Sequence, residues 1–161
     1  MKTLIVYASI ADCEILSQIA YASTRYLNYP EEYFLRWKED LTVTEEYLRA
    51  NTVRKLMFGN ETIGFDSIEL NETEQTIESV YIEKGYWLDH FFIKPEYVGL
   101  HFRKMMFLDS LSYCRKHEIK EIKIFVDPKS EGFYQKMGCK KVRMSKSSAT
   151  GREIPVYNFM I

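Results

Sequence analysis

The spacing of apolar and polar residues along the chain predicts strands that alternate with helices. Short apolar or alternating runs, bounded by turn residues, predict strands over residues 4–7, 53–58, 62–70, 86–93, 121–126, 140–144 and 154–160. Residues 76–82 also alternate, which fits either a further strand or a long loop. Gly59 and Asn60 predict a hairpin turn between the second and third of the listed strands.

Five helices are predicted, over residues 12–26, 30–37, 42–48, 100–117 and 129–137. Ser9 or Asp12 would cap the first helix, Pro30 would begin the second, and the capping-box pattern Thr42-x-x-Glu45 would begin the third. The 3.6-residue period of the fourth helix should bury Phe102, Met105, Met106, Leu108, Leu111 and Cys114. The strands before and after this helix should be parallel. Together these elements predict an α/β fold with a mixed, mostly antiparallel sheet and helices on both faces.

Composition narrows the class of protein. The chain has 161 residues, 46% of them hydrophobic, which predicts a single domain over residues 1–161 with a substantial core. A net charge of −1 argues against a nucleic-acid partner. No apolar run is long enough to span a membrane, and three scattered cysteines without metal-ligand spacing predict no metal site and a reducing, cytoplasmic location.

Two short motifs lie in the segment 88–142. Pro95-Glu96-Tyr97 is followed by Gly99, and the run 132–138 reads GFYQKMG. Both resemble the GNAT (GCN5-related) N-acetyltransferases, whose stretches P-x-Y-R-G-x-G-x-G and x-FYEKxGF they match. Together with a likeness over residues 41–47 and in the tail over residues 147–155, the resemblance covers most of the chain. It implies a GNAT-like acyl-CoA N-acyltransferase fold and an enzyme that uses acetyl-CoA to acetylate amines.

The resemblance also implies where acetyl-CoA would bind. Its pantetheine arm would add as a strand along Phe91, Phe92 and Ile93, and its pyrophosphate would meet the start of the following helix. The remaining cofactor-binding residues that the resemblance implies are Val98, Gly99, Leu100, His101, Phe102, Arg103, Lys104, Asp127 and Phe133. Many members of the family carry Asn at the place of Asp127, so a carboxylate near CoA departs from the family pattern. Alternatively, Asp127 caps the helix that follows.

The phosphate loop departs from the family pattern Arg/Gln-x-x-Gly-x-Gly/Ala, because those places hold Val98, His101 and Arg103. Side chains in place of glycine can crowd a phosphate, which would leave a GNAT-fold pseudoenzyme with a binding or regulatory role. Alternatively, His101 and Arg103 can add positive charge and hydrogen-bond donors for the pyrophosphate.

Three residues are candidates for the chemistry. The family motif places a general acid at Tyr134, which would protonate the departing CoA thiolate. An amine with a pKa of about 10.4 is mostly charged at pH 7 and needs a base, for which Asp89, His90 or a water chain are the alternatives. Adjacent residues of a strand point to opposite faces, so at most one of the two faces the reaction. Backbone N–H groups near Phe92 or Ile93 would hold the oxyanion.

The acceptor is expected to be a primary amine of a small molecule or peptide. Tyr29 and Trp37 are candidate substrate-binding rings, with Glu31 and Glu32 available to attract a cation. The same rings could equally hold the first two helices together. A homodimer that pairs through the C-terminal strand and a Tyr-rich surface is compatible with both the acetyltransferase and the pseudoenzyme.

Overall fold

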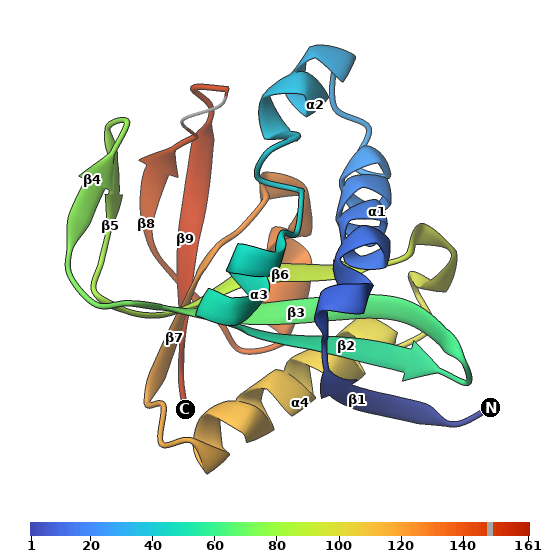
Figure 1. The fold of residues 1–161 in the computed structure, drawn as a ribbon. Helices are drawn as coiled ribbons and strands as arrows, with labels where there is room; N and C mark the ends of the chain where they lie inside the picture. Colours follow the sequence, from blue (N-terminus) through green and yellow to red (C-terminus); the bar gives the residue numbers. More distant parts are fainter. Residues whose placement is uncertain (148–149) are drawn as a thin grey trace. The chain divides into compact units, whose positions relative to one another are not determined.

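A seven-stranded sheet has the order β1-β2-β3-β6-β7-β9-β8 (Figure 1). The computed structural model describes residues 1–147 and 150–161. The strands of the sheet are β1 (Thr3–Tyr7), β2 (Thr52–Phe58), β3 (Glu61–Asn71), β6 (Gly85–Ile93), β7 (Glu121–Phe125), β8 (Lys140–Lys146) and β9 (Glu153–Met160). The pairs β1–β2, β2–β3, β7–β9 and β8–β9 are antiparallel, and β6–β7 is parallel. The mixed, mostly antiparallel sheet predicted from the sequence is confirmed.

Five α-helices accompany these strands in the described residues, and they are α1 (Cys13–Arg25), α2 (Glu31–Trp37), α3 (Glu45–Ala50), α4 (Phe102–Lys116) and α5 (Glu131–Lys136). Three short 3-10 turns are η1 (Ile10–Asp12), η2 (Pro95–Tyr97) and η3 (Pro128–Ser130). None of the helices in the described part of the chain is long and apolar enough to cross a lipid bilayer.

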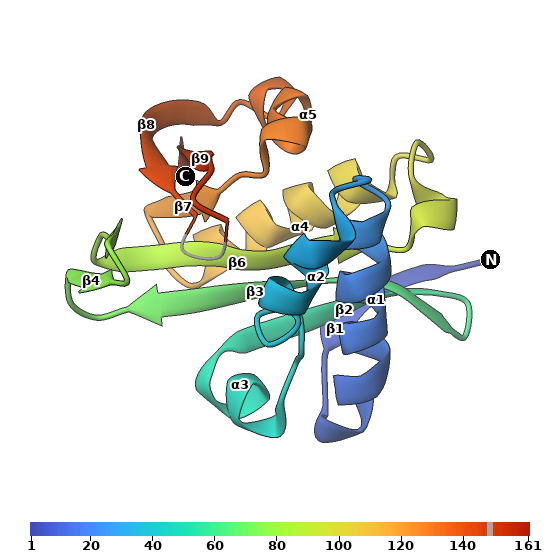
Figure 2. The ribbon, with the colours of Figure 1, turned by 90° about the horizontal axis from the view of Figure 1, so that it is seen from above.

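The chain forms two compact units. The first contains residues 1–68 and 90–110, and the second contains residues 69–89 and 111–161. Within the first unit, helices cover both faces of the strands (Figure 2). On one face α1 packs through Leu16 and Ile19 against Phe65. On the other face Met106 of α4 packs with Leu56 of β2.

Two predictions about local structure need correction, the cap of α3 and the stretch 76–82. The cap of α3 is Thr44, whose hydroxyl accepts from the amide of Tyr47, whereas the Thr42 hydroxyl donates back to the carbonyl of Lys38. The stretch 76–82 is a hairpin of β4 (Gln75–Ile77) and β5 (Val80–Ile82). Its turn residues Glu78 and Ser79 have positive φ values of 49° and 70°. Hairpin turns with positive φ usually contain Asn, Asp or Gly, so the sequence did not indicate this turn.

The buried face of α4 is also rotated relative to the prediction. Met105 and Leu108 are 40% and 49% exposed, whereas Phe107 and Ser110 are fully buried. Ser110 is drawn inside because its hydroxyl hydrogen bonds to Asp66, which is itself buried. Met106, Leu111 and Cys114 are buried, as predicted.

Candidate active site

The C-terminal half of β6 presents a strand edge in the first unit. The Lys94 amide donates to the carbonyl of Ile63 at 2.8 Å, and the His90 amide donates to the hydroxyl of Ser67 at 2.9 Å, both on the β3 side. Because amides of successive residues in a strand point to opposite sides, the Ile93 amide points away from β3. The parallel register of β6 with β7 covers Tyr86 and Trp87. Of the two amides that the sequence proposed for an oxyanion, geometry favours Ile93 over Phe92.

Gly64 allows β3 to lie close to this part of β6. A Cβ added at Gly64 would come within 2.8 Å of the Phe92 carbonyl oxygen and 3.5 Å of the Cα of Ile93. Both are backbone atoms, so neither can rotate out of the way. Gly64 is a residue that the sequence could not single out, because the requirement comes from a strand distant in the chain.

Replacing Gly64 with alanine should therefore shift β6 at Phe92 and lower stability by about 1–3 kcal/mol, as overpacking does. Gly132→Ala is the matched control, since its added Cβ meets nothing within 4 Å. Thermal denaturation of both variants would check this, and an equal, small effect in the two would contradict the close contact at Gly64.

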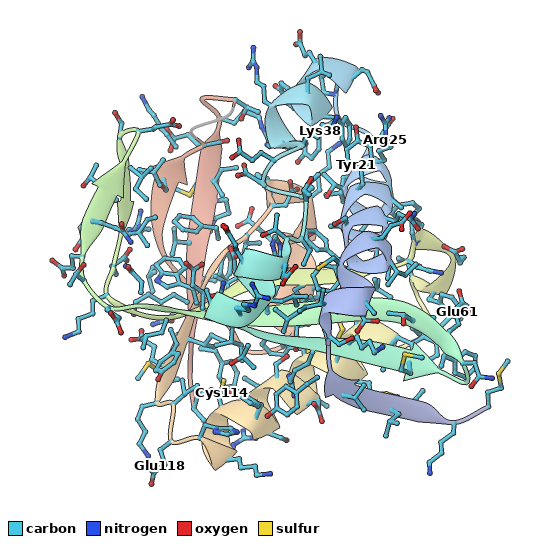
Figure 3. The ribbon with its side chains drawn as sticks, viewed as in Figure 1. Tyr21, Arg25, Lys38, Glu61, Cys114 and Glu118 are labelled. Carbon is cyan, nitrogen blue, oxygen red and sulfur yellow. The ribbon has the colours of Figure 1, made fainter. Side chains whose placement is uncertain are left out.

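The loop after β6 is fixed by a cluster of rings. The ring of Tyr97 in η2 lies 6.0 Å from that of Phe58 and 5.6 Å from that of Phe102, centroid to centroid. Its hydroxyl donates to Glu61 at 2.6 Å, and Lys94 pairs with the same carboxylate at 2.8 Å. Glu61, labelled in Figure 3, lies at the turn between β2 and β3. The Lys94 and Tyr97 hydrogen bonds lower the pKa of Glu61, so the carboxylate stays charged and holds the loop.

The loop reaches α4 through two residues in the left-handed conformation, Gly99 with φ 83° and His101 with φ 69°. The carbonyl of His101 accepts from the Met105 amide at 3.1 Å, so His101 is the capping residue directly before α4. A glycine at this place of the family motif would adopt a positive φ without strain, and His is one of the residue types that tolerate it. Leu100, His101 and Lys104 are exposed, and Val98, Phe102 and Arg103 are half-buried. The first turn of α4 is therefore accessible, and it carries two cationic side chains.

His90 is buried among rings in the first unit. Its imidazole lies 5.1 Å from the ring of Tyr47, 5.7 Å from Phe65 and 5.6 Å from Phe92. The Ser67 hydroxyl, which accepts from the His90 amide, also hydrogen bonds the Tyr47 hydroxyl at 2.7 Å. No pattern in the sequence indicates that Tyr47 and Ser67 meet His90, because the contact joins α3, β3 and β6.

The predicted acceptor rings belong to an aromatic cluster in α2 and the segment before it. Tyr29 and Trp37 meet edge to face at 5.5 Å, and Tyr33 contacts both. All three are half-buried. At the end of α1, the Arg25 guanidinium lies over the Tyr21 ring at 4.9 Å and pairs with Glu31 at 2.6 Å (Figure 3). Glu31 is therefore already neutralised by Arg25.

The other candidate residues lie in the second unit. Asp89 is exposed, and it raises the pKa of Glu69, although burial of Glu69 contributes more to that shift. The Asp127 carboxylate accepts from the Lys129 amide at 2.8 Å, which is the capping role considered for it. Tyr134 is 6% exposed, and its ring meets that of the half-buried Phe133 at 5.2 Å.

Among residues 1–147 and 150–161, no three His, Cys, Asp or Glu side chains come together in a group that could hold a metal ion. Cys114 and Cys139 are buried, and burial raises the pKa of the Cys139 thiol to about 12. The Cys139 thiol is therefore protonated at neutral pH.

Comparison by sequence finds no matching family model and no matching curated protein. Comparison by structure finds many matches. The PaiA N-acetyltransferase from Thermoplasma acidophilum in complex with coenzyme A has a TM-score of 0.78 and 19% identity, with 100% of both chains covered. A GCN5-related N-acetyltransferase from Rhodopseudomonas palustris has a TM-score of 0.78 and 15% identity, with 100% of this chain and 97% of that one covered.

A GNAT-family acetyltransferase from Elizabethkingia anophelis with acetyl-CoA bound has a TM-score of 0.67 and 12% identity, covering 99% of this chain and 98% of that one. Likeness at these identities establishes the fold. The chain has the fold of the GNAT-family N-acetyltransferases, as the motifs in its sequence indicated.

Proposed function

We propose that this protein is an acetyl-CoA-dependent N-acetyltransferase that acts on a primary amine of a small molecule or peptide, with residues 1–161 as one catalytic domain. The observation that carries the proposal is the segment formed by the end of β6, the loop 94–101 and the first turn of α4. It offers a strand amide turned away from β3, a loop in left-handed conformation at Gly99 and His101, and an accessible helix start.

The residues of this segment fit the ligand's chemistry. Amides at the start of α4 and the helix dipole favour an anion, and Arg103 and His101 can donate hydrogen bonds to a pyrophosphate. The edge at Phe91, Phe92 and Ile93 would pair with the amide groups of the pantetheine arm. When bound, acetyl-CoA supplies an activated acetyl thioester. The Ile93 amide would then donate to the carbonyl oxygen as negative charge develops on it.

Removal of the amine proton is assigned to Asp89 or His90, directly or through water. Asp89 is exposed, which suits a carboxylate that accepts a proton through solvent. His90 is enclosed by Tyr47, Phe65 and Phe92, which suits a residue that holds β6 in place. The half-exposed rings of Tyr29 and Trp37 would bind the acceptor, and their mutual contact orients them for this.

Two measurements on the purified protein test the proposal. Calorimetric titration with acetyl-CoA should give a dissociation constant in the micromolar range. Incubation of acetyl-CoA with a panel of primary amines should release free CoA thiol above the rate without amine. Binding without thiol release for any amine would favour the pseudoenzyme that the altered loop at Val98, His101 and Arg103 suggests. Failure to bind at millimolar ligand would overturn acetyl-CoA as the substrate.

Arg103→Ala should weaken acetyl-CoA binding about tenfold, because a charge-assisted hydrogen bond to a phosphate is lost. Lys104→Ala is the matched control, since Lys104 is the exposed neighbour in the same helical turn and is expected to change the affinity little. Calorimetry on the two variants measures both effects. Equal affinities for wild type and Arg103→Ala would mean that Arg103 does not meet the phosphates.

A further inference from the structure

The strand β1 ends the sheet on the side of β2, and its backbone is arranged for one more partner. The Gly59 amide donates to the carbonyl of Lys2 at 2.8 Å, and the Ala8 amide donates to the carbonyl of Val53 at 2.9 Å. In the antiparallel register of β1 with β2, these bonds fix the even-numbered residues of β1 as those that bond to β2. The backbone groups of Thr3, Ile5 and Tyr7 therefore point to the outer edge.

We propose that this edge binds β1 of a second copy of the chain, antiparallel and about a two-fold axis at Ile5. When the two-fold axis passes through a hydrogen-bonded pair, the residue at the centre points its backbone outward, and the other outward-pointing residues lie symmetrically around it. Ile5 meets the first condition, and Thr3 and Tyr7 meet the second. Thr3 of each copy would then exchange backbone hydrogen bonds with Tyr7 of the other copy. At the centre, the two Ile5 residues would exchange backbone hydrogen bonds with each other.

The side chains of β1 are complementary to themselves in this register. Leu4 would stand opposite Val6 of the second copy, on the same face of the extended sheet. Leu4 is 53% exposed and Tyr7 is 64% exposed, so their apolar surface is available. The segment Thr3-Leu4-Ile5-Val6-Tyr7 contains no charge and no proline. Charged residues and proline usually protect an edge strand from pairing with another chain, and β1 lacks both.

The opposite end of the sheet differs in this respect. β8 has the sequence KKVRMSK, with four cationic residues among seven. Lys141 and Arg143 are in ion pairs with Glu131 and Glu83. Pairing β8 with a second β8 would still bring Lys140 and Lys146 near the same residues of the second copy, which opposes association. The C-terminal strand β9, which the sequence suggested as a dimer contact, lies between β7 and β8 and has both edges occupied. Charge therefore selects β1 for pairing with a second copy.

A contact through one strand of five residues is small relative to a standard protein interface. The proposed dimer is therefore reversible and depends on protein concentration. Its existence is independent of acetyl-CoA or any enzymatic activity.

Sedimentation velocity over a range of protein concentrations tests the proposal with two variants of β1. Tyr7→Pro removes an outward-pointing amide and should weaken dimerisation at least about tenfold. Leu4→Lys leaves the backbone intact and places one lysine of each copy diagonally opposite the other across the two-fold axis. It should weaken dimerisation by a similar factor. Leu70→Lys is the matched control, because Leu70 is a leucine of similar exposure, 47%, outside β1. It should dimerise as the wild type does.

Hydrogen exchange of individual amides identifies the edge directly. The amides of Thr3, Ile5 and Tyr7 should exchange slowly at high protein concentration and fast on dilution, while those of Leu4, Val6 and Ala8 stay protected in both. A protein that is monomeric up to millimolar concentration overturns the proposal. A dimer in which the three odd-numbered amides exchange fast, or that Leu4→Lys and Tyr7→Pro leave intact, overturns it as well.

Discussion

Asp66→Ala is expected to destabilise the protein by about 3–5 kcal/mol, the usual cost of removing one partner of a buried ion pair. Asp66 and Arg54 are 1% and 7% exposed, and the guanidinium contacts both carboxylate oxygens, at 2.8 and 3.3 Å. Burial raises the pKa of the Asp66 carboxyl, and the hydrogen bonds from Arg54 and Ser110 oppose that shift. Removing the carboxylate leaves a buried cation without its main partner. For a chain of this length the melting temperature should fall on the order of 10 °C.

Asp109→Ala is the matched control, because Asp109 pairs with the other end of the same guanidinium at 2.6 Å. Its side chain is 42% exposed, so solvent can replace it and the expected cost is about 1 kcal/mol or less. The double variant Arg54→Met, Asp66→Leu removes both buried charges and should recover most of the lost stability. Chemical denaturation of the three variants measures each difference. Equal losses for Asp66→Ala and Asp109→Ala would contradict the role of burial.

The same ion pair explains one limit of the sequence analysis. Periodicity places the longest helix and most of its inward face, but it assumes that inward residues are apolar. Ser110 lies inside because Asp66 needs its hydroxyl, and this turns Leu108 outward. An interaction between β2, β3 and α4 thus overrides the local pattern. Helix and strand positions elsewhere follow from local runs and turn residues, and they are predicted to within a few residues.

The candidate site was predicted where it rests on contiguous residues and missed where it rests on distant ones. The run from Phe91 to Lys104 is continuous in sequence, so its motif could be identified. Gly64 matters only because β3 approaches Phe92, and Ser67 matters only because its hydroxyl replaces a backbone partner for the His90 amide. Strand order decides such contacts, and no local signal reports it. For the same reason the sequence suggested a dimer contact at the C-terminal strand, although β9 lies between β7 and β8.

Tyr134→Phe is expected to lower kcat by about 10²-fold or more, with little change in the affinity for acetyl-CoA. In the proposed reaction the Tyr134 hydroxyl donates its proton to the CoA sulfur as the carbon–sulfur bond breaks. Without a donor the product would leave as a thiolate, whose conjugate acid has a pKa of about 8.5. The loss therefore falls on the chemical step, and a calorimetric dissociation constant should stay near that of the wild type.

A buried tyrosine can also matter only for stability, so a second hydroxyl deletion in the same unit separates the two roles. Tyr157 is 1% exposed, and its hydroxyl donates to Glu131 at 2.7 Å and accepts from Gln135 at 3.0 Å. Tyr157→Phe should lose about 1–2 kcal/mol of stability, because two hydrogen bonds disappear, while its kcat is retained. Tyr134→Phe should instead lose turnover while it keeps its affinity for acetyl-CoA. If both variants lose stability and both keep their turnover, Tyr134 is a core residue and the proton comes from elsewhere.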